Sequence, residues 1–487
     1  MPSSTFTVHT SLSFDAQQKK FVENVSLQID GATGTITDVY HRSLSDDACL
    51  VLGKDDIDLR SKVVLPGLVD SHTHIFLHSY RERSGTEQMR DESAVERVVR
   101  ATHAARAALL AGFTTYRDLG TEALGNADAN LRDCINRGIT PGPRMFVATE
   151  ALASSGSYEL RMENRLGGQL VVPRACDAAD GVDGVRAAVR RRVGDGADLI
   201  KLYADYRRKV MRFPPMGPRP VRFPPPENKK NPAVPLYSQQ EMDAVVEEAE
   251  RAEMVVAAHA GETRAALMAV RAGVRTVEHI FEDTDGIAEK LFEEMRERGT
   301  IWVPTLAAAE LMVDADIFAA QKVMVKRAFD VGVRLATGGD TGTFDHGLNA
   351  RELEILVEAG LPVEEVLAAA TVGGWEACGG DRCGFRFGWF EKGNRADVVA
   401  LDDDPRVNKR ALRNVSFVMK DGETWKRDAK AVTDMVIHVP CWPEEGRESS
   451  PSRRSSDEWT ELSGAQPPMG YVVPPVVCKS VKEYERA

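Results

Sequence analysis

Two histidines on one face of an apolar segment give the strongest chemical signal in this sequence. His72 and His74 close the segment VVLPGLVDSHTH, and Thr73 separates them. Side chains two residues apart lie on the same face of a strand, so both imidazoles can reach one metal ion while Thr73 points away. Alone, the HxH pattern is weak, because two histidines at an exposed strand end would look the same. The interpretation as metal ligands therefore depends on the rest of the chain.

Residue types that bind metals also end other apolar segments. His259 lies in MVVAAHAG, His279 in TVEHI and Asp340 in RLATGGD. Parallel strands of a barrel bring their carboxyl ends to one rim, so we expect these side chains to meet the HxH pair there. Polar strand ends that arise by chance are the alternative, and the number of coincident positions argues against it.

A lysine interrupts a further apolar segment, DLIKLYAD. If Ile200 and Leu202 point outward, Lys201 points into the barrel, where an unpaired ammonium is costly. Three explanations are open: a carboxylate partner, a Schiff-base role, or reaction with CO₂ to give a carbamate. The carbamate accounts for most of the pattern, because it turns a buried cation into an oxygen ligand that can bridge two metal ions. Four imidazoles, one carbamate and one aspartate suit two zinc-like ions roughly 3.5–4 Å apart.

The middle of the chain predicts the elements that position these residues. Apolar, strand-like runs alternate there with amphipathic helical stretches, which is typical of a parallel α/β sheet. Ser238 and Glu241 form a capping box that marks the start of one such helix. The eight expected strands are residues 63–74, 113–120, 144–153, 198–205, 254–261, 276–280, 301–307 and 334–340. Eight strand–helix units predict an α/β fold, a (β/α)8 TIM-like barrel with its active site at the carboxyl ends of the strands.

Both ends of the chain predict a second, smaller domain. Short alternating strands occur in residues 1–65 and return in residues 386–440. We therefore expect a small β-sandwich domain formed by both chain ends, flanking a metal-dependent barrel of residues 66–385. Residues 207–235 contain nine prolines and are expected to form a loop. Residues 441–487 are rich in Ser, Glu, Arg and Pro and are expected to be a flexible tail.

The segments that carry these residues resemble the amidohydrolase superfamily. Within it, the chain is similar to the imidazolonepropionase-like and Xaa-Pro dipeptidase-like group, which includes ochratoxinase-like carboxypeptidases. The resemblance runs from about residue 5 to about residue 440. It is carried by VVLPGLVDSHTH, AGFTTYRDLG, GADLIKLYAD, VVAAHAG, TVEHI, ATGGDTGTFDHG and KGNRADVVALDDDP.

The resemblance implies a ligand set and a mechanism. His72, His74 and Asp340 would hold one divalent ion, His259 and His279 the other, and Lys201, carboxylated by CO₂, would bridge both; the ions would be Zn²⁺. A metal-bridging hydroxide would attack the amide carbonyl of a dipeptide or an N-acyl amino acid. Asp340 would be catalytic, first as general base and then as general acid toward the leaving amine.

Substrate identity is less well defined by the sequence. Many relatives carry a glycine pair soon after the lysine, whereas this chain reads KLYADYRRKV. The loop of residues 207–235 carries eight Lys or Arg residues and one acidic residue. It either steers a carboxylate-bearing small molecule or faces water without a substrate role. Tyr203 and His346 either bind substrate or support a neighbouring ligand.

Three alternative functions differ in what they require of these residues. A cyclic-amide hydrolase of the imidazolonepropionase type would use the same site, and only the pocket shape separates the two. A mononuclear deaminase would not need a barrel lysine such as Lys201. A catalytically silent scaffold would not need all six ligand-type residues.

Composition narrows the partners and the compartment. A net charge of −12 argues against nucleic-acid binding, which requires a basic surface. We find no secretory signal and no apolar run of membrane-spanning length. Seven widely spaced cysteines predict free thiols in a reducing compartment. The expectation is a cytoplasmic homo-oligomer that acts on a small-molecule substrate, with no membrane partner.

Overall fold

A computed structural model describes residues 5–43, 49–157, 175–207, 233–283 and 285–432. The predicted tail of residues 441–487 and most of the proline-rich loop lie outside the described residues. All five cysteines in the described ranges are free thiols. Within the same ranges, no helix is long and apolar enough to cross a membrane.

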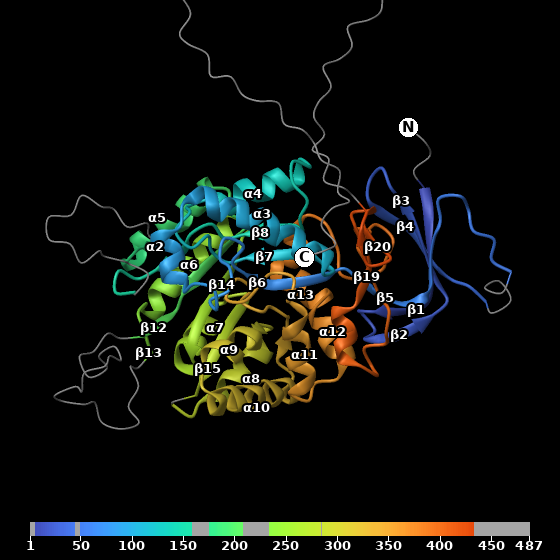
Figure 1. Ribbon diagram of the computed structural model, residues 1–487. Helices are drawn as coiled ribbons and strands as arrows, with labels where there is room; N and C mark the ends of the chain where they lie inside the picture. The colour runs from blue at the N-terminus through green and yellow to red at the C-terminus, as the bar shows by residue number, and fades with distance from the viewer. Residues whose placement is uncertain (1–4, 44–48, 158–174, 208–232, 284, 433–487) are drawn as a thin grey trace, which may run out of the picture. The chain divides into compact units, whose positions relative to one another are not determined.

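Strands from both ends of the chain share one nine-stranded sheet (Figure 1). β5 is its centre, because it pairs in parallel with β1 and antiparallel with β18. The sheet therefore joins the first and last described segments, as the alternating patterns predicted, while a second layer of a sandwich stays a prediction. Its strands are β1 (Thr5–Asp15), β2 (Lys20–Glu23), β3 (Val25–Asp30), β4 (Thr35–His41), β5 (Ile57–Pro66), β18 (Val398–Leu401), β19 (Val415–Lys420), β20 (Glu423–Arg427) and β21 (Lys430–Ala431).

The middle of the chain forms two parallel sheets. One has the order β6-β7-β8, and the other has the order β10-β9-β11-β14-β15-β16-β17. Their strands are β6 (Leu68–Thr73), β7 (Phe113–Asp118), β8 (Arg144–Val147), β9 (Ala151–Ala153), β10 (Cys176–Ala178), β11 (Leu199–Tyr203), β14 (Val255–Glu262), β15 (Thr276–Glu282), β16 (Ile301–Val303) and β17 (Arg334–Leu335). All eight expected strands are thus present, although two are divided: the first at Gly67 into β5 and β6, and the third into β8 and β9.

Backbone hydrogen bonds connect the two parallel sheets at both junctions. The N–H of Asp198, next to β11, donates to the carbonyl of Val147 in β8 at 2.8 Å. On the other side, the N–H of Ser71 in β6 donates to the carbonyl of Thr337, just after β17, also at 2.8 Å. The mixed α/β architecture agrees with the sequence, and the fully closed barrel stays a prediction that these contacts support.

Helices follow most of the strands in the two parallel sheets (Figure 1). The predicted capping box is confirmed at the start of α6, where the Ser238 side chain and Glu241 satisfy each other's backbone N–H groups. The helices are α2 (Gly85–Asp91), α3 (Ala94–Leu110), α4 (Ala127–Asn136), α5 (Gly181–Gly194), α6 (Gln239–Arg251), α7 (Thr263–Ala272), α8 (Ala288–Arg298), α9 (Leu306–Met312), α10 (Ala315–Val331), α11 (Ala350–Glu358), α12 (Val363–Ala369) and α13 (Val372–Cys378), with 3-10 turns η1 (Gly380–Cys383) and η2 (Lys409–Arg413).

The proline-rich segment departs from a plain loop at its two ends. β12 (Asp205–Arg207) pairs antiparallel with β13 (Ala233–Pro235), so a short hairpin stem encloses residues 208–232. The predicted range of 207–235 is therefore too wide, because backbone pairing extends into both of its ends.

Close packing beside His72 gives a test of this arrangement. A Cβ atom on Gly338 would lie 2.6 Å from the backbone nitrogen of His72 and 2.7 Å from Cγ1 of Val303. Because a backbone atom in a paired strand cannot move aside, Gly338→Ala should lower the free energy of unfolding by about 1–3 kcal/mol. Denaturant unfolding measures this change.

Gly194→Ala is the matched control. Gly194 ends α5, and a Cβ there would meet no atom within 4 Å. Its free energy of unfolding should stay the same or rise by at most about 1 kcal/mol. Equal stability of the two variants would show that the space beside His72 accepts a methyl group.

Candidate active site

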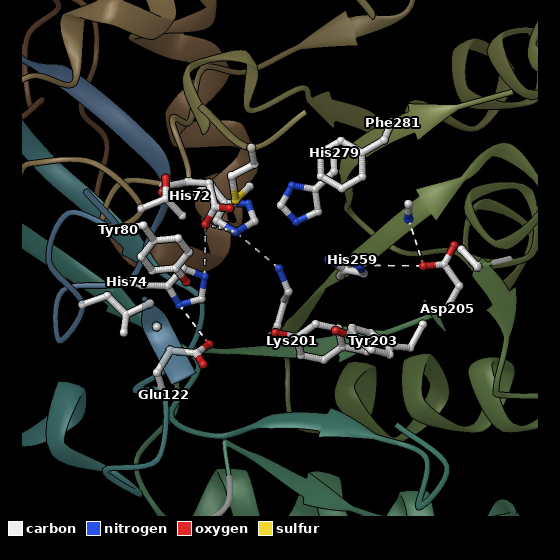
Figure 2. Close-up of a pocket in the computed structure, with 18 of the residues that line it drawn as sticks. His72, His74, Tyr80, Glu122, Lys201, Tyr203, Asp205, His259, His279 and Phe281 are labelled. Atoms are coloured by element: carbon white, nitrogen blue, oxygen red, sulfur yellow. Dashed lines mark hydrogen bonds and ion pairs between the residues drawn. The ribbon is translucent and has the colours of Figure 1, made fainter. Parts of the chain in front are cut away.

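The six predicted ligand residues all line one cavity of about 410 Å³ (Figure 2). They come from strand ends far apart in the chain, as the barrel topology predicted. The residues are His72 and His74 at the end of β6, Lys201 on β11, His259 on β14, His279 on β15 and Asp340 after β17. The volume is within the range of small-molecule sites.

Asp340 lies between the two histidines of the HxH pair. Its Oδ1 atom is 3.4 Å from Nε2 of His72 and 3.3 Å from Nε2 of His74. His72 and Asp340 also form a cluster with His279 whose possible ligand atoms all lie within 4.8 Å of one another. One side of the cavity thus places two imidazoles and a carboxylate around a common point.

His259 lies across the cavity from the HxH pair, and His279 lies near both His259 and His72. The Lys201 amine lies between the two sides (Figure 2). The rings of His259 and His279 have centroids 4.6 Å apart, and the ring of His279 is 4.8 Å from that of His72. The Lys201 amine approaches Nε2 of His72 at 3.5 Å. The lysine side chain is nearly inaccessible to solvent, as expected for a strand residue that points inward.

Protein partners fix the orientation of three of the imidazoles. Nδ1 of His72 contacts Glu278 at 2.8 Å, Nδ1 of His74 contacts the carbonyl of Gly120 at 3.0 Å, and Nδ1 of His279 contacts the Thr305 hydroxyl at 2.8 Å. Each contact leaves Nε2 directed toward the cavity. Contacts of this kind orient the rings of metal-ligating histidines in proteins.

The sequence reasoning missed Glu278 and its partner Arg117. The two side chains form a fully buried ion pair at 2.8 Å, while Glu278 also contacts His72. Strand alternation alone would place Glu278 and His279 on opposite faces. His279 has a φ of 76°, and this left-handed backbone breaks the alternation at the strand end. The one available signal was the acidic residue directly before His279 in TVEHI.

Several residues at or next to this cavity have a left-handed backbone. Asp340 has a φ of 56°, Thr305 of 53° and Glu122 of 51°, in addition to His279. Such non-glycine conformations cost on the order of 1–3 kcal/mol each and persist where the surrounding structure holds them. The fold therefore accepts local strain to aim these side chains.

Three of the four imidazoles are held neutral. Burial lowers the pKa of His259 to about 3, and burial together with nearby charges lowers the pKa of His72 and His279 well below the usual value. Burial also acts to lower the pKa of His74, but its hydrogen bond to Asp340 and the charge of Glu122 outweigh it and raise the pKa to about 9. Neutral imidazole is the form that binds metals.

The two remaining predicted ligands also have shifted pKa values. Burial lowers the pKa of Lys201 to about 8, which favours the neutral amine more than usual. For Asp340, burial acts to raise the pKa, but the neighbouring His72, His74 and Lys201 outweigh it and lower the pKa to about 2. A carboxylate that stays ionised and three neutral imidazoles are a donor set that fits divalent metal ions.

Tyr203 and His346, the two predicted substrate contacts, differ in position. Tyr203 lines the cavity, and its ring centroid lies 4.8 Å from that of His259. His346 faces protein on both sides, with Nδ1 at 3.4 Å from the Tyr116 hydroxyl and Nε2 at 3.2 Å from the carbonyl of Leu77. These contacts suit a supporting role for His346, and a substrate contact by either residue stays a prediction.

The remaining wall of the cavity combines aromatic, apolar and acidic side chains. Among the described residues that line it, Lys201 is the only lysine or arginine. Burial raises the pKa of Asp205 to about 7, although backbone N–H donors act in the opposite direction. Lining residues that the sequence did not single out include Leu77, Tyr80, Met89, Glu122, Asp205, Tyr206, Glu262, Phe281, Glu282 and Met312.

Comparison with known proteins identifies the family. A model of the amidohydrolase family matches residues 63–425. Ochratoxinase from Aspergillus niger is 28% identical over 404 residues, which cover 75% of this chain and 76% of the relative. Imidazolonepropionase from Bdellovibrio bacteriovorus is 25% identical over 369 residues, which cover 72% and 76%.

A solved structure supports the same assignment. A Xaa-Pro dipeptidase with methionine bound in its active site has 28% identity and a TM-score of 0.71, over 87% of this chain and 100% of that chain. The family model spans all six residues that meet at the cavity. The resemblance drawn from the sequence is thereby confirmed: the chain belongs to the amidohydrolase family and is a hydrolase of amide carbon–nitrogen bonds.

Proposed function

We propose that this protein is a binuclear metal-dependent amidohydrolase that cleaves a peptide-like amide bond in a dipeptide or an N-acyl amino acid. One observation carries the proposal: four imidazoles, an ionised carboxylate and a buried lysine surround a single cavity. His72, His74 and Asp340 would hold one ion, and His259 and His279 the other. We also propose that the two parallel sheets form the closed eight-stranded barrel of the fold, since hydrogen bonds connect both junctions.

Lys201 would become the bridging ligand by reaction with CO₂. The neutral amine attacks the carbon of CO₂, an N–C bond forms, and the amine releases one proton to leave an anionic carbamate. Burial assists this step, because it lowers the pKa of Lys201 to about 8 and so raises the neutral fraction. The reaction also removes an ammonium group from a cavity where it is poorly solvated.

The reaction needs an activated water and a proton carrier. Two divalent ions, which we propose to be Zn²⁺, would supply Lewis acidity toward the scissile carbonyl and make hydroxide available near neutral pH. Asp340 would hold and move the proton: its carboxylate accepts a proton from the attacking water and later donates it to the leaving amine. Burial acts to raise the pKa of Asp340, but His72 and His74 act to lower it, which favours the ionised carboxylate that the first step needs.

The proposed substrate class agrees with the relatives and with the size of the cavity. The Xaa-Pro dipeptidase similar to this chain holds methionine, a free amino acid, in its active site. An amino-acid product fits a cavity of about 410 Å³, and the substrate would then bear a carboxylate. A homo-oligomeric enzyme in the cytoplasm remains our expectation.

Two alternatives would use the same residues differently. Imidazolonepropionase is among the relatives, so hydrolysis of a cyclic amide is the second candidate. A catalytically silent scaffold is the third, and the strained backbone that aims Asp340 and His279 argues against it, because a scaffold gains nothing from this strain.

Metal removal tests the proposal. Dialysis against a chelator should abolish hydrolysis of dipeptides and N-acyl amino acids, and Zn²⁺ should restore it, because the attacking group depends on the ions. Elemental analysis should find about two ions per chain. Full activity in a metal-free preparation would contradict the proposal. Turnover of cyclic amides alone would favour the second candidate, and a chain without metal and without activity the third.

The carbamate has its own test. Intact-mass spectrometry under native conditions should show the added mass of one CO₂, and Lys201→Ala should lack it. Reconstitution with Zn²⁺ in CO₂-depleted buffer should give little activity until bicarbonate is added. Lys201→Ala should lower kcat/KM by about 100-fold or more. Removing a residue that only hydrogen-bonds to a metal ligand costs about 10–100-fold, and the loss of the bridging ligand itself should cost more. Equal activity with and without CO₂ would show that the amine remains unmodified.

Asp340→Asn tests the proton carrier. The amide keeps the size of the side chain but cannot accept and return a proton, so kcat should fall by about 10²- to 10⁴-fold. Metal analysis of the same preparation separates loss of catalysis from loss of the ion. A variant with both ions and undiminished kcat would exclude Asp340 from proton transfer.

A further inference from the structure

Asp205 is a buried carboxylate at the edge of the cavity that the proposed mechanism does not use. It begins β12, two residues after Tyr203, and its side chain is 1% exposed. It pairs with Pro235 across the hairpin stem that encloses residues 208–232. Figure 2 shows Asp205 directed toward the ring of His259.

Three contacts connect Asp205 to the end of β14. Its Oδ1 atom accepts a hydrogen bond from the N–H of Gly261 at 2.9 Å, and Oδ2 accepts one from the N–H of Glu262 at 3.0 Å. The same Oδ1 atom lies 3.7 Å from Nε2 of His259. Asp205 therefore lies within ion-pair distance of the imidazole of a proposed ligand and accepts hydrogen bonds from the backbone two and three residues beyond it.

His259 is turned the opposite way from the other imidazoles. In His72, His74 and His279, Nδ1 contacts a protein oxygen, whereas in His259 Nε2 faces Asp205. Nδ1 is then the nitrogen of His259 that is left for a ligand in the cavity. A ring nitrogen that carries the proton donates to an oxygen, and the other nitrogen stays free to coordinate.

Ring contacts alone do not select this orientation. The His259 ring lies between the ring of Tyr203, at 4.8 Å, and that of His279, at 4.6 Å. Such contacts restrict the plane of the imidazole, but they are nearly the same after a half-turn that exchanges its two nitrogens. A carboxyl oxygen on one side distinguishes the two states: Oδ1 of Asp205 already accepts the N–H of Gly261, so it attracts a protonated ring nitrogen and repels a lone pair.

We propose that Asp205 is the positioning residue of His259: it holds the Nε2–H side of the ring and thereby presents Nδ1 to one metal ion. The inference rests on the proposed function, since it assigns His259 as a ligand. It also assigns a role to the base of the proline-rich segment. The hairpin stem, through its first residue, fixes the geometry of one ligand.

The test compares Asp205→Asn with a matched variant elsewhere in the chain. Asp56, directly before β5, makes similar contacts, although its side chain is 18% exposed. It accepts N–H groups from Thr7 at 2.8 Å and Gly53 at 2.7 Å, and it lies 3.5 Å from Nε2 of His9. Asp56→Asn therefore controls for the loss of a carboxylate that supports backbone and a histidine. Both variants should remain folded, as thermal unfolding would show.

Zn²⁺ binding is the first readout. Competition with a chromophoric chelator should show that Asp205→Asn binds one of its two ions about 10–100-fold more weakly, the usual cost of removing a partner of a ligating histidine. Asp56→Asn should keep both affinities. His259→Ala should weaken the same ion, and adding Asp205→Asn to it should have little further effect, because the two residues act on one interaction.

A second readout, the tautomer of His259, needs no metal. It can be measured even if Asp205→Asn aggregates when Zn²⁺ is added. In the wild-type protein with ¹⁵N-labelled histidine, NMR should find His259 with its proton on Nε2, and Asp205→Asn should shift the population toward Nδ1–H. A wild-type protein that binds no ions would refute the proposed function itself. Wild-type binding of two ions with unchanged affinities in Asp205→Asn, or an unchanged tautomer of His259, would overturn only the role of Asp205.

Discussion

The structure depends on one electrostatic constraint: six polar side chains, all largely buried, meet at a single cavity. Unpaired polar groups are costly there, and charged groups more so. The cavity limits the cost by keeping three imidazoles neutral and by placing the carboxylate of Asp340 between two histidines. What remains is a concentration of electron-pair donors around one point, which is the requirement of a cation site.

Elements outside the cavity hold these donors in place. The buried Arg117–Glu278 pair orients the imidazole of His72, and the Thr305 hydroxyl orients that of His279. Glu278 lies within β15, and Thr305 lies just after β16. Gly338 lets β6 approach the segment after β17 closely enough for both to reach the rim. Local strain near Asp340 is thus compensated by packing and hydrogen bonds elsewhere, a distribution typical of functional sites.

The sequence predicted those features that follow from periodicity and strand ends, and it missed those that follow from partner choice. The six positions that meet at the cavity could be found because each closes or interrupts an apolar run. Glu278 and Asp205 could not, because only the folded chain shows which ring each one faces. The division at Gly67 was also hidden: an apolar run continues through it, while the backbone passes from one sheet into another. The pattern of apolar residues indicates which residues are buried. Residues on both sides of Gly67 are buried, so the pattern does not show the change of sheet.

The balance of charge in the cavity explains why substrate recognition was the least predictable feature. The described wall carries Glu122, Asp205, Glu262 and Glu282, and Lys201 is its single lysine or arginine. Carbamate formation would remove the charge of that lysine. An anionic substrate would be repelled by such a wall in isolation. Two divalent ions would reverse the sign near the reacting centre, because bound cations are the largest local charges in a site of this kind. The ions would then have two roles, in catalysis and in attracting a carboxylate-bearing substrate. Substrate recognition would depend on the charge of the ions, which the amino-acid sequence does not contain.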